Sequence, residues 1–301
     1  MTNFNFWKQV KETIDQNIEV IVCVVVSHTG SSPGKTGFKL LVDQRGKTYG
    51  TVGGGIMEFD LLQELTTRFN NFNGIEFKEY VHRENVSRKS GAICSGKQTI
   101  FIQKIKKTAF PEIIRNYGSK KHLHFTSYGM KILDHISDEY YCEELDYQNK
   151  IHLFGGGHIG YATSRILNTL DFHISLYDHR ELDLINENIF VHNKYIGPYE
   201  HHIDNIQKND FVVVATFGYA FDLEVLKSIH NHLTPKYIGL MGSKTKAKKI
   251  FSHLTSSGVS REFIDNINAP IGLKISDGTA EEIAVSICAQ ILKIKNTSIH
   301  L

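Results

Sequence analysis

The chain has 301 residues, of which 41% are hydrophobic and 22% are charged, and its 34 Lys and Arg residues nearly balance 32 Asp and Glu. This length and composition fit a globular protein of two domains. The formal net charge of +2 gives no reason to expect nucleic acid or an anionic membrane as a partner. The four cysteines are widely separated, which excludes a disulfide framework and a zinc-site spacing.

The sequence carries no sign of a membrane or secretory segment. The first 16 residues lack a basic region followed by an apolar core, so we expect no signal peptide. The longest apolar runs, such as residues 20–26 and 211–215, are too short to span a bilayer. With no disulfide pattern, we predict a cytoplasmic protein.

The first half predicts a small mixed α+β domain. Apolar residues at helical spacing predict helices at 5–17 and 56–69, with a further short helix at 111–117. Runs of β-branched and aromatic residues predict strands at 20–26, 38–42, 47–52, 77–82, 98–105, 123–127 and 130–133. A polar loop spans 83–96. The charged, aperiodic segment 141–150 suggests the boundary, which gives domains at 1–145 and 146–301.

From residue 151 onward, strands alternate with helices. Strands are predicted at 151–154, 173–177, 211–215 and 237–240, and helices at 161–170, 244–256 and 279–293. Thr279 and Glu282 have the spacing of a capping box at the start of the last helix. This alternation predicts a Rossmann-type, doubly wound parallel sheet, and hence an α/β fold for this half.

A glycine-rich loop follows the first of these strands. Gly155, Gly157 and Gly160 form a G-x-G-x-x-G pattern, in which the glycines allow a tight turn, backbone approach to a pyrophosphate and close helix packing. His158 lies inside the loop. Asp178 follows Gly160 by 18 residues (178 − 160), near the ~20 expected for an acid that binds a ribose 2′-hydroxyl. The alternative is a Rossmann fold that no longer uses its dinucleotide site.

A second glycine cluster, comprising Gly53, Gly54 and Gly55, lies between a predicted strand and a predicted helix, with Glu58 one turn later. Bare backbone N–H groups at a helix start are able to cradle an anion, and we predict that this loop does so. The alternative is a plain turn that needs positive φ. If the preceding small-residue loop folds over the glycines, the residues that line the same side are Ser31, Ser32 and Lys35.

Among the four cysteines, Cys94 is the candidate for a metal-binding or reactive thiol. Cys94 lies among small residues at 91–96, where a thiol is accessible to a metal or a reactant; an inert thiol is the alternative. Cys23 and Cys288 lie in apolar periodic segments and are predicted to be core residues. Cys142 lies in the expected linker and is assigned no role.

Together these motifs resemble the xanthine dehydrogenase accessory (XdhC/CoxI) family, the molybdenum-cofactor chaperones. The similar segments in the first half are residues 30–33, 39–42, 50–55 with Glu58, and 91–96. Those in the second half are residues 154–160, 178–180, 237–243, 269–273 and 281–287. The chain departs from the family pattern at three places: Gly34 stands where Arg is usual, Ser95 interrupts Cys-Gly-Gly, and Tyr219 stands where His is frequent.

The resemblance implies a protein that binds molybdenum cofactor (molybdopterin), protects it during sulfuration and inserts it into a xanthine dehydrogenase-type molybdoenzyme. It implies that apo-enzyme and a cysteine desulfurase as partners. Cys94 would then be a molybdenum contact, since thiolate is a soft ligand. We also predict a homodimer, with no catalytic residues of its own.

The Rossmann motif alone supports a different function, an NAD(P)-dependent oxidoreductase. On that hypothesis Asp178 favours NAD over NADP, because a carboxylate repels a 2′-phosphate. Against it, the sequence offers no recognisable acid–base pair or metal triad for hydride chemistry. A scaffold with a vestigial nucleotide site is the third alternative.

Overall fold

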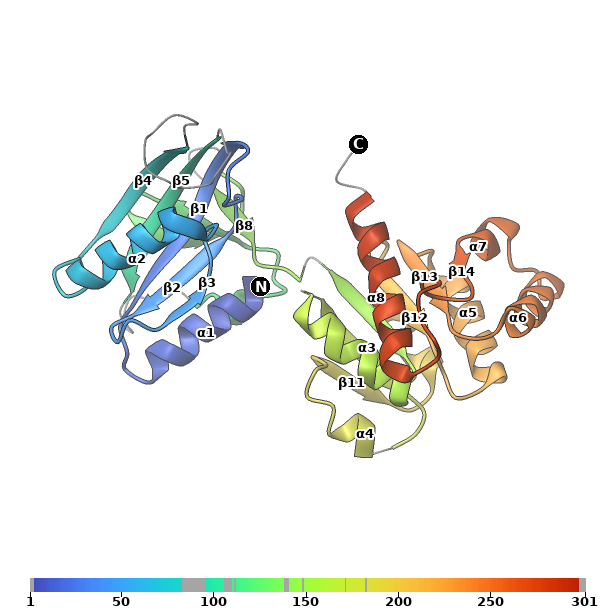
Figure 1. Cartoon of the computed structure of the whole chain (residues 1–301). Helices are drawn as coiled ribbons and strands as arrows, with labels where there is room; N and C mark the ends of the chain where they lie inside the picture. The colour runs from blue at the N-terminus through green and yellow to red at the C-terminus, as the bar shows by residue number, and fades with distance from the viewer. Residues whose placement is uncertain are drawn as a thin grey trace. The chain divides into compact units, whose positions relative to one another are not determined.

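The structure is a computed structural model that describes residues 3–82, 96–105, 110, 112–137, 141–147, 149–170, 172–181 and 183–297. The chain divides into two compact units, Met1–Tyr147 and Gln148–Leu301 (Figure 1). Each unit has its own hydrophobic cores. No helix in the described ranges is both long enough and apolar enough to cross a membrane.

The first unit combines helices with two antiparallel sheets, as the sequence predicts. Its five-stranded sheet has the order β3-β2-β1-β5-β4, and its three-stranded sheet has the order β7-β6-β8. The elements are α1 (Asn3–Asp15), β1 (Val20–Gly30), β2 (Lys39–Asp43), β3 (Thr48–Gly50), α2 (Gly55–Arg68), β4 (Ile75–His82), β5 (Gly96–Ile105), η2 (Ile114–Asn116), β6 (His122–Thr126), β7 (Gly129–Leu133) and β8 (Cys142–Glu144).

The continuous apolar run of β1 is explained by burial on both faces of the larger sheet. Val22 and its alternate neighbours pack against α1 and the smaller sheet, whereas Ile21 and Cys23 face the core that contains α2. Burial raises the pKa of the Cys23 thiol, which confirms it as a core residue. The strand extends to Gly30, beyond the predicted end, because it stays paired with β5 as far as Gly96.

Two predicted segments of this unit are wrong in detail. The helix expected at 111–117 is a single 3-10 turn, η2. The supposed linker contains a strand, β8, which pairs with β6. The strand lacks an apolar sequence pattern because its middle residue is Glu143. The Glu143 carboxylate is buried and forms a 2.7 Å ion pair with the buried Lys39 ammonium. Glu143 also accepts a 2.7 Å hydrogen bond from the indole of Trp7, so α1, β2 and β8 meet at one polar contact.

The second unit has the doubly wound parallel sheet that the sequence predicts. Its strand order is β11-β10-β9-β12-β13-β14, and its strand pairs are parallel. The elements are β9 (Lys150–Phe154), α3 (His158–Thr169), β10 (His173–Asp178), α4 (Asp183–Asn186), β11 (Asn193–Ile196), η3 (Tyr199–Asn205), β12 (Phe211–Val214), α5 (Tyr219–His232), β13 (Tyr237–Leu240), α6 (Lys244–Ser256), α7 (Arg261–Asp265), β14 (Ile267–Asn268) and α8 (Ala280–Thr297).

Helices cover both faces of this sheet. The core containing Leu153 and Ile174 packs against α3 and α8, which lie side by side (Figure 1). The opposite core, containing Phe154 and Val212, packs against α5, α6 and α7. Cys288 is buried in the α8 core, where burial raises its pKa to about 12, so it is a core residue as predicted.

The environment of His173, the first residue of β10, predicts that acid lowers the stability of this unit. Burial, and then the nearby His192, lowers the pKa of His173 to about 3, whereas an unfolded histidine titrates near 6.5. Between these values the unfolded chain binds the additional proton, so the free energy of unfolding falls as the pH drops from 6.5 towards 3. We expect His173→Gln to reduce this fall by about 2 kcal/mol after allowance for partial exposure.

Thermal unfolding at pH 7, 6, 5 and 4 measures this effect. The exposed His201 provides a matched control, because His201→Gln removes a histidine of the same unit from solvent. If the stability of His173→Gln changes with pH as much as that of the wild-type protein, another group controls the acid response.

Candidate functional site

Two loops of the first unit and the first residue of β5 meet backbone to backbone. A Cβ atom on Gly34 would lie 2.1 Å from the Val52 carbonyl oxygen, and one on Gly53 would lie 2.5 Å from the Gly34 nitrogen. A Cβ atom on Gly96 would lie 2.7 Å from the Ser32 nitrogen. The loops at 30–35 and 52–55 and the start of β5 are thus in direct contact. Position 34 has no room for the side chain that the family resemblance suggested.

Gln98 on β5 joins these loops. Its side-chain oxygen accepts hydrogen bonds from the Ser32 hydroxyl at 2.5 Å and the Gly34 N–H at 3.0 Å. Its amide nitrogen donates to the Val52 carbonyl at 3.1 Å. Gln98 is fully buried, so these hydrogen bonds satisfy polar atoms that have no access to water. Sequence reasoning missed Gln98, because a single glutamine in a strand carries no spacing signal.

The glycine cluster has the backbone geometry of an anion cradle. Gly53, Gly54 and Gly55 have φ values of 130°, 70° and 66°, which glycine adopts without a steric penalty. One carboxylate oxygen of Glu58 accepts hydrogen bonds from the Val52 N–H at 2.8 Å, the Gly54 N–H at 3.0 Å and a hydroxyl at 2.6 Å. The cradle therefore holds a negative group of its own chain.

Three other residues predicted for this site belong to the loop that contacts Gly53. Ser32 is buried against Gln98, whereas Ser31 and Lys35 are exposed in the same loop. A Cβ atom on Gly54 or Gly55 would meet no described atom within 4 Å, so this side of the loop is open with respect to the described residues. Cys94 lies outside the described residues.

The phosphate loop of the second unit lies at the point where the strand order reverses, between β10 and β12. Gly155 has φ 117°, and a Cβ atom on it would lie 2.1 Å from the Ala215 carbonyl oxygen. A Cβ atom on Gly160 would lie 2.1 Å from the Gly155 carbonyl oxygen, so both glycines are required for close packing. Gly157 caps α3, and a Cβ on it would meet no described atom within 4 Å; His158 is exposed beside it.

Asp178 lies at the end of β10, but its carboxylate is fully buried and faces the phosphate loop. It accepts a 2.7 Å hydrogen bond from the Gly156 N–H and three from Arg180, at 3.0 Å from the backbone and 2.9 Å from both Nε and Nη2. Burial alone would raise the pKa of Asp178, but the Arg180 and Gly156 hydrogen bonds outweigh it and hold the pKa below its ordinary value. The carboxylate therefore stays charged and orders the loop.

A second buried acid, missed in the sequence, stabilises the neighbouring loops. Asp222 accepts hydrogen bonds from the Thr216 hydroxyl at 2.6 Å and the Thr216 N–H at 3.2 Å, and it forms an ion pair with Lys246. Lys246 also donates to the Met241 carbonyl at 3.2 Å. Burial raises the pKa of Asp222 in spite of these partners. The loops after β12 and β13 are thereby tied together at the carboxyl edge of the sheet.

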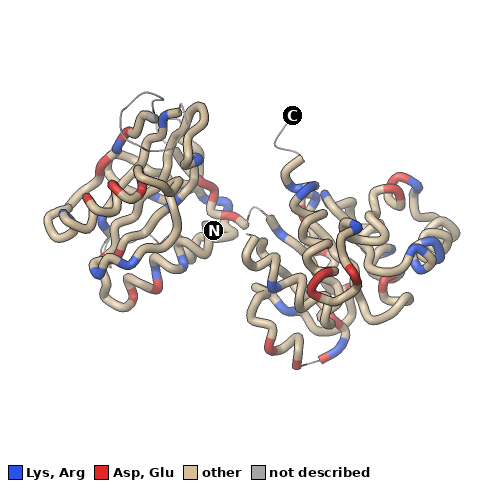
Figure 2. Tube along the Cα trace, in the orientation of Figure 1, with Lys and Arg blue, Asp and Glu red and all other residues tan. Residues whose placement is uncertain are grey.

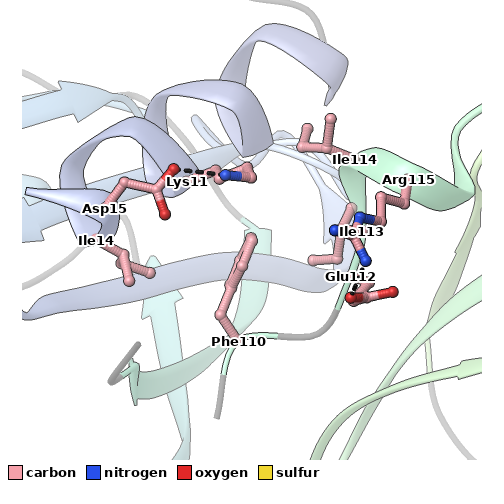
Figure 3. Close-up of a pocket in the computed structure, with 8 residues that line it drawn as sticks. All are labelled: Lys11, Ile14, Asp15, Phe110, Glu112, Ile113, Ile114 and Arg115. Atoms are coloured by element: carbon pink, nitrogen blue, oxygen red, sulfur yellow. Dashed lines mark hydrogen bonds and ion pairs between the residues drawn. The ribbon is translucent and has the colours of Figure 1, made fainter. Parts of the chain in front are cut away.

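Two of the pockets in the structure are lined by residues outside both glycine-rich loops, and the first includes Lys246, the partner of Asp222. One has a volume of about 700 Å³ beside the lysine-rich start of α6 (Figure 2), and there the Tyr219 hydroxyl is 2.5 Å from Nδ1 of His253. It is lined by Tyr219, Ser243, Thr245, Lys246, Lys249, Ser252 and His253. The other, of about 270 Å³, lies between the end of α1 and the η2 segment and contains no predicted site residue (Figure 3). Among the described residues, no group of three or more His, Cys, Asp or Glu is placed to hold a metal ion.

Comparison with protein families gives a match in each half of the chain. The model of the XdhC Rossmann domain matches residues 151–291, and that of the XdhC and CoxI family matches residues 13–71. The chain belongs to the XdhC family. The first match spans the phosphate loop, Asp178 and Asp222, and the second spans the Gly53–Gly55 cradle and Gln98's partner loops.

Two curated relatives and a crystal structure are similar to this chain over most of its length. The chain is 21% identical to a protein of Bacillus subtilis described as a probable xanthine dehydrogenase subunit, with 97% of this chain and 98% of that protein covered. It is 25% identical to the uncharacterized protein YqeB of Escherichia coli K12 over 98% of its own length, but it spans 47% of that protein. A crystal structure described as a xanthine dehydrogenase from Bacillus halodurans has the same fold, with a TM-score of 0.76, 18% identity, and 99% and 96% of the two chains covered.

Proposed function

We propose that this XdhC-family protein is an accessory factor that binds molybdenum cofactor, protects it during sulfuration and inserts it into a xanthine dehydrogenase-type molybdoenzyme. The observation that carries the proposal is that the loop at 30–35 and the start of β5 meet the loop that contains the Gly53–Gly55 cradle. The proposed partners are that apo-enzyme and a cysteine desulfurase, and the proposed state is a cytoplasmic homodimer.

The residues of the cradle fit the phosphate part of the cofactor, which is a phosphorylated pterin. The Gly54 N–H donates to the Glu58 carboxylate, so a phosphate would bind at this N–H in place of that carboxylate. Ser31 and Lys35 are exposed in the loop whose backbone contacts Gly53. The bound group would supply the molybdenum centre, and this chain's residues would hold its phosphate.

Cys94 is the proposed metal contact. It lies two residues before Gly96, whose backbone is in contact with Ser32. A thiolate is a soft ligand that suits molybdenum or its sulfur. The family match makes an accessory role the better-supported function, and the phosphate loop at the switch point supports the alternative, an NAD(P)-dependent oxidoreductase.

Anaerobic gel filtration with molybdenum cofactor released from a donor enzyme tests the proposal. The wild-type protein should retain molybdenum and pterin in its elution peak, and Cys94→Ala should retain about tenfold less, which corresponds to about 1.4 kcal/mol. Cys142→Ala is the matched control, because it removes a thiol from β8 of the same unit. If the cofactor elutes separately from the wild-type protein, the proposal is contradicted. If Cys94→Ala retains the cofactor in full, the role of Cys94 is contradicted.

A further inference from the structure

Arg180 and Phe217 lie across the end of the phosphate-loop strand. Arg180 follows β10 and Phe217 follows β12, and these two strands flank β9. The guanidinium carbon of Arg180 is 4.4 Å from the centroid of the Phe217 ring. The Arg180 side chain is 34% exposed and Phe217 is 48% exposed, so both are reachable from solvent. A cationic group on an aromatic platform therefore borders the loop that begins at Gly155.

The exposed groups at the end of β10 are hydrogen-bond donors. Asp178, at the usual place of a ribose-binding acid, is 0% exposed and accepts four hydrogen bonds from Gly156 and Arg180. Arginine carries five side-chain N–H groups; one on Nε and one on Nη2 donate to Asp178, which leaves three. Of this ion pair, only the Arg180 guanidinium side is thus exposed to solvent.

We propose that the Rossmann unit binds a dinucleotide that carries a ribose 2′-phosphate, the NADP class, and that Arg180 selects it over the unphosphorylated NAD class. The ribose lies at the end of the second strand of such a sheet, where an acid binds a 2′-hydroxyl or an arginine binds a 2′-phosphate. A guanidinium forms charge-assisted, bidentate hydrogen bonds with phosphate oxygens. Phe217 holds the guanidinium plane, because stacking orients it.

This selectivity reverses the expectation drawn from Asp178 in the sequence. An acid at the strand end repels a 2′-phosphate most strongly when it is exposed and unpaired, and here Asp178 is buried and paired with Arg180. The inference concerns the second unit alone and does not depend on molybdenum-cofactor binding by the first.

Calorimetric titration with 2′-phospho-ADP-ribose and with ADP-ribose tests the inference, because both probes lack the nicotinamide. The wild-type protein should bind the 2′-phosphorylated probe at least about tenfold more tightly, and Arg180→Gln should abolish this preference. Arg165→Gln is the control, since it removes an exposed arginine of α3 from the same unit. Equal or tighter binding of ADP-ribose, or binding of neither probe, overturns the proposal.

A second variant covers the case in which Arg180→Gln fails to fold, since that change leaves Asp178 buried without its cation. Phe217→Leu keeps both charges and alters a half-exposed ring. It should retain the wild-type circular dichroism and lose most of the preference for the 2′-phosphate. An unchanged preference in Phe217→Leu would remove the Arg180–Phe217 pair from the site.

Discussion

Replacing Lys39 with methionine should lower the free energy of unfolding of the first unit by about 3–5 kcal/mol. The side chains of Lys39 and Glu143 are 2% and 3% exposed, and their charged atoms are 2.7 Å apart. Removal of the ammonium leaves a buried carboxylate that water cannot solvate. Urea unfolding followed by fluorescence measures the loss, because Trp7 is the single tryptophan of the chain and donates to Glu143.

The double variant Lys39→Met/Glu143→Gln separates the effect of the charge from that of packing. The glutamine keeps an acceptor for the Trp7 indole and carries no charge, so we expect it to recover about half or more of the lost stability. Lys8→Met is the control, since the exposed Lys8 and Glu12 are 3.9 Å apart and the expected change is below about 1 kcal/mol. A single variant as stable as Lys8→Met would show that the ion pair contributes little.

This ion pair also explains why one part of the fold escaped prediction. Apolar periodicity locates elements that bury nonpolar side chains, and it found β1, α2 and the central strands of the five-stranded and six-stranded sheets. It does not find β8, whose middle residue is a buried glutamate neutralised by a lysine on a distant strand. The helix α5 was missed as well, because Tyr219–His232 mixes buried apolar residues with histidines and a buried acid.

The candidate site shows the same division between local and distant signals. Glycine spacing predicted both loops, because the need for positive φ or close backbone approach is local to the chain. The partners of the loops were not predictable, since Gln98 and Lys246 reach them through the tertiary fold. The direction of the Asp178 carboxylate likewise depends on Arg180 and Gly156. The sequence shows where Asp178 lies along the chain but not which way its side chain points.

Gly155→Ala should lower stability and Gly157→Ala should lower ligand affinity, although both residues lie in the phosphate loop. A methyl group on Gly155 would overlap the Ala215 carbonyl at 2.1 Å and would require φ 117°, so β9 and β12 must separate. We expect a loss of about 3–5 kcal/mol in the second unit, because backbone atoms cannot move aside as a flexible side chain does. Calorimetric unfolding and hydrogen exchange of the β9 amides measure this loss.

Gly157→Ala should leave stability within about 0.5 kcal/mol, since its φ is −69° and a Cβ would meet no described atom within 4 Å. The same methyl group would occupy the space through which a phosphate approaches the start of α3, so binding of 2′-phospho-ADP-ribose should weaken about tenfold or more. Unchanged affinity in a stable Gly157→Ala protein would mean that the ligand does not lie on this loop. The loop would then stabilise the fold through Gly155 and Gly160 alone.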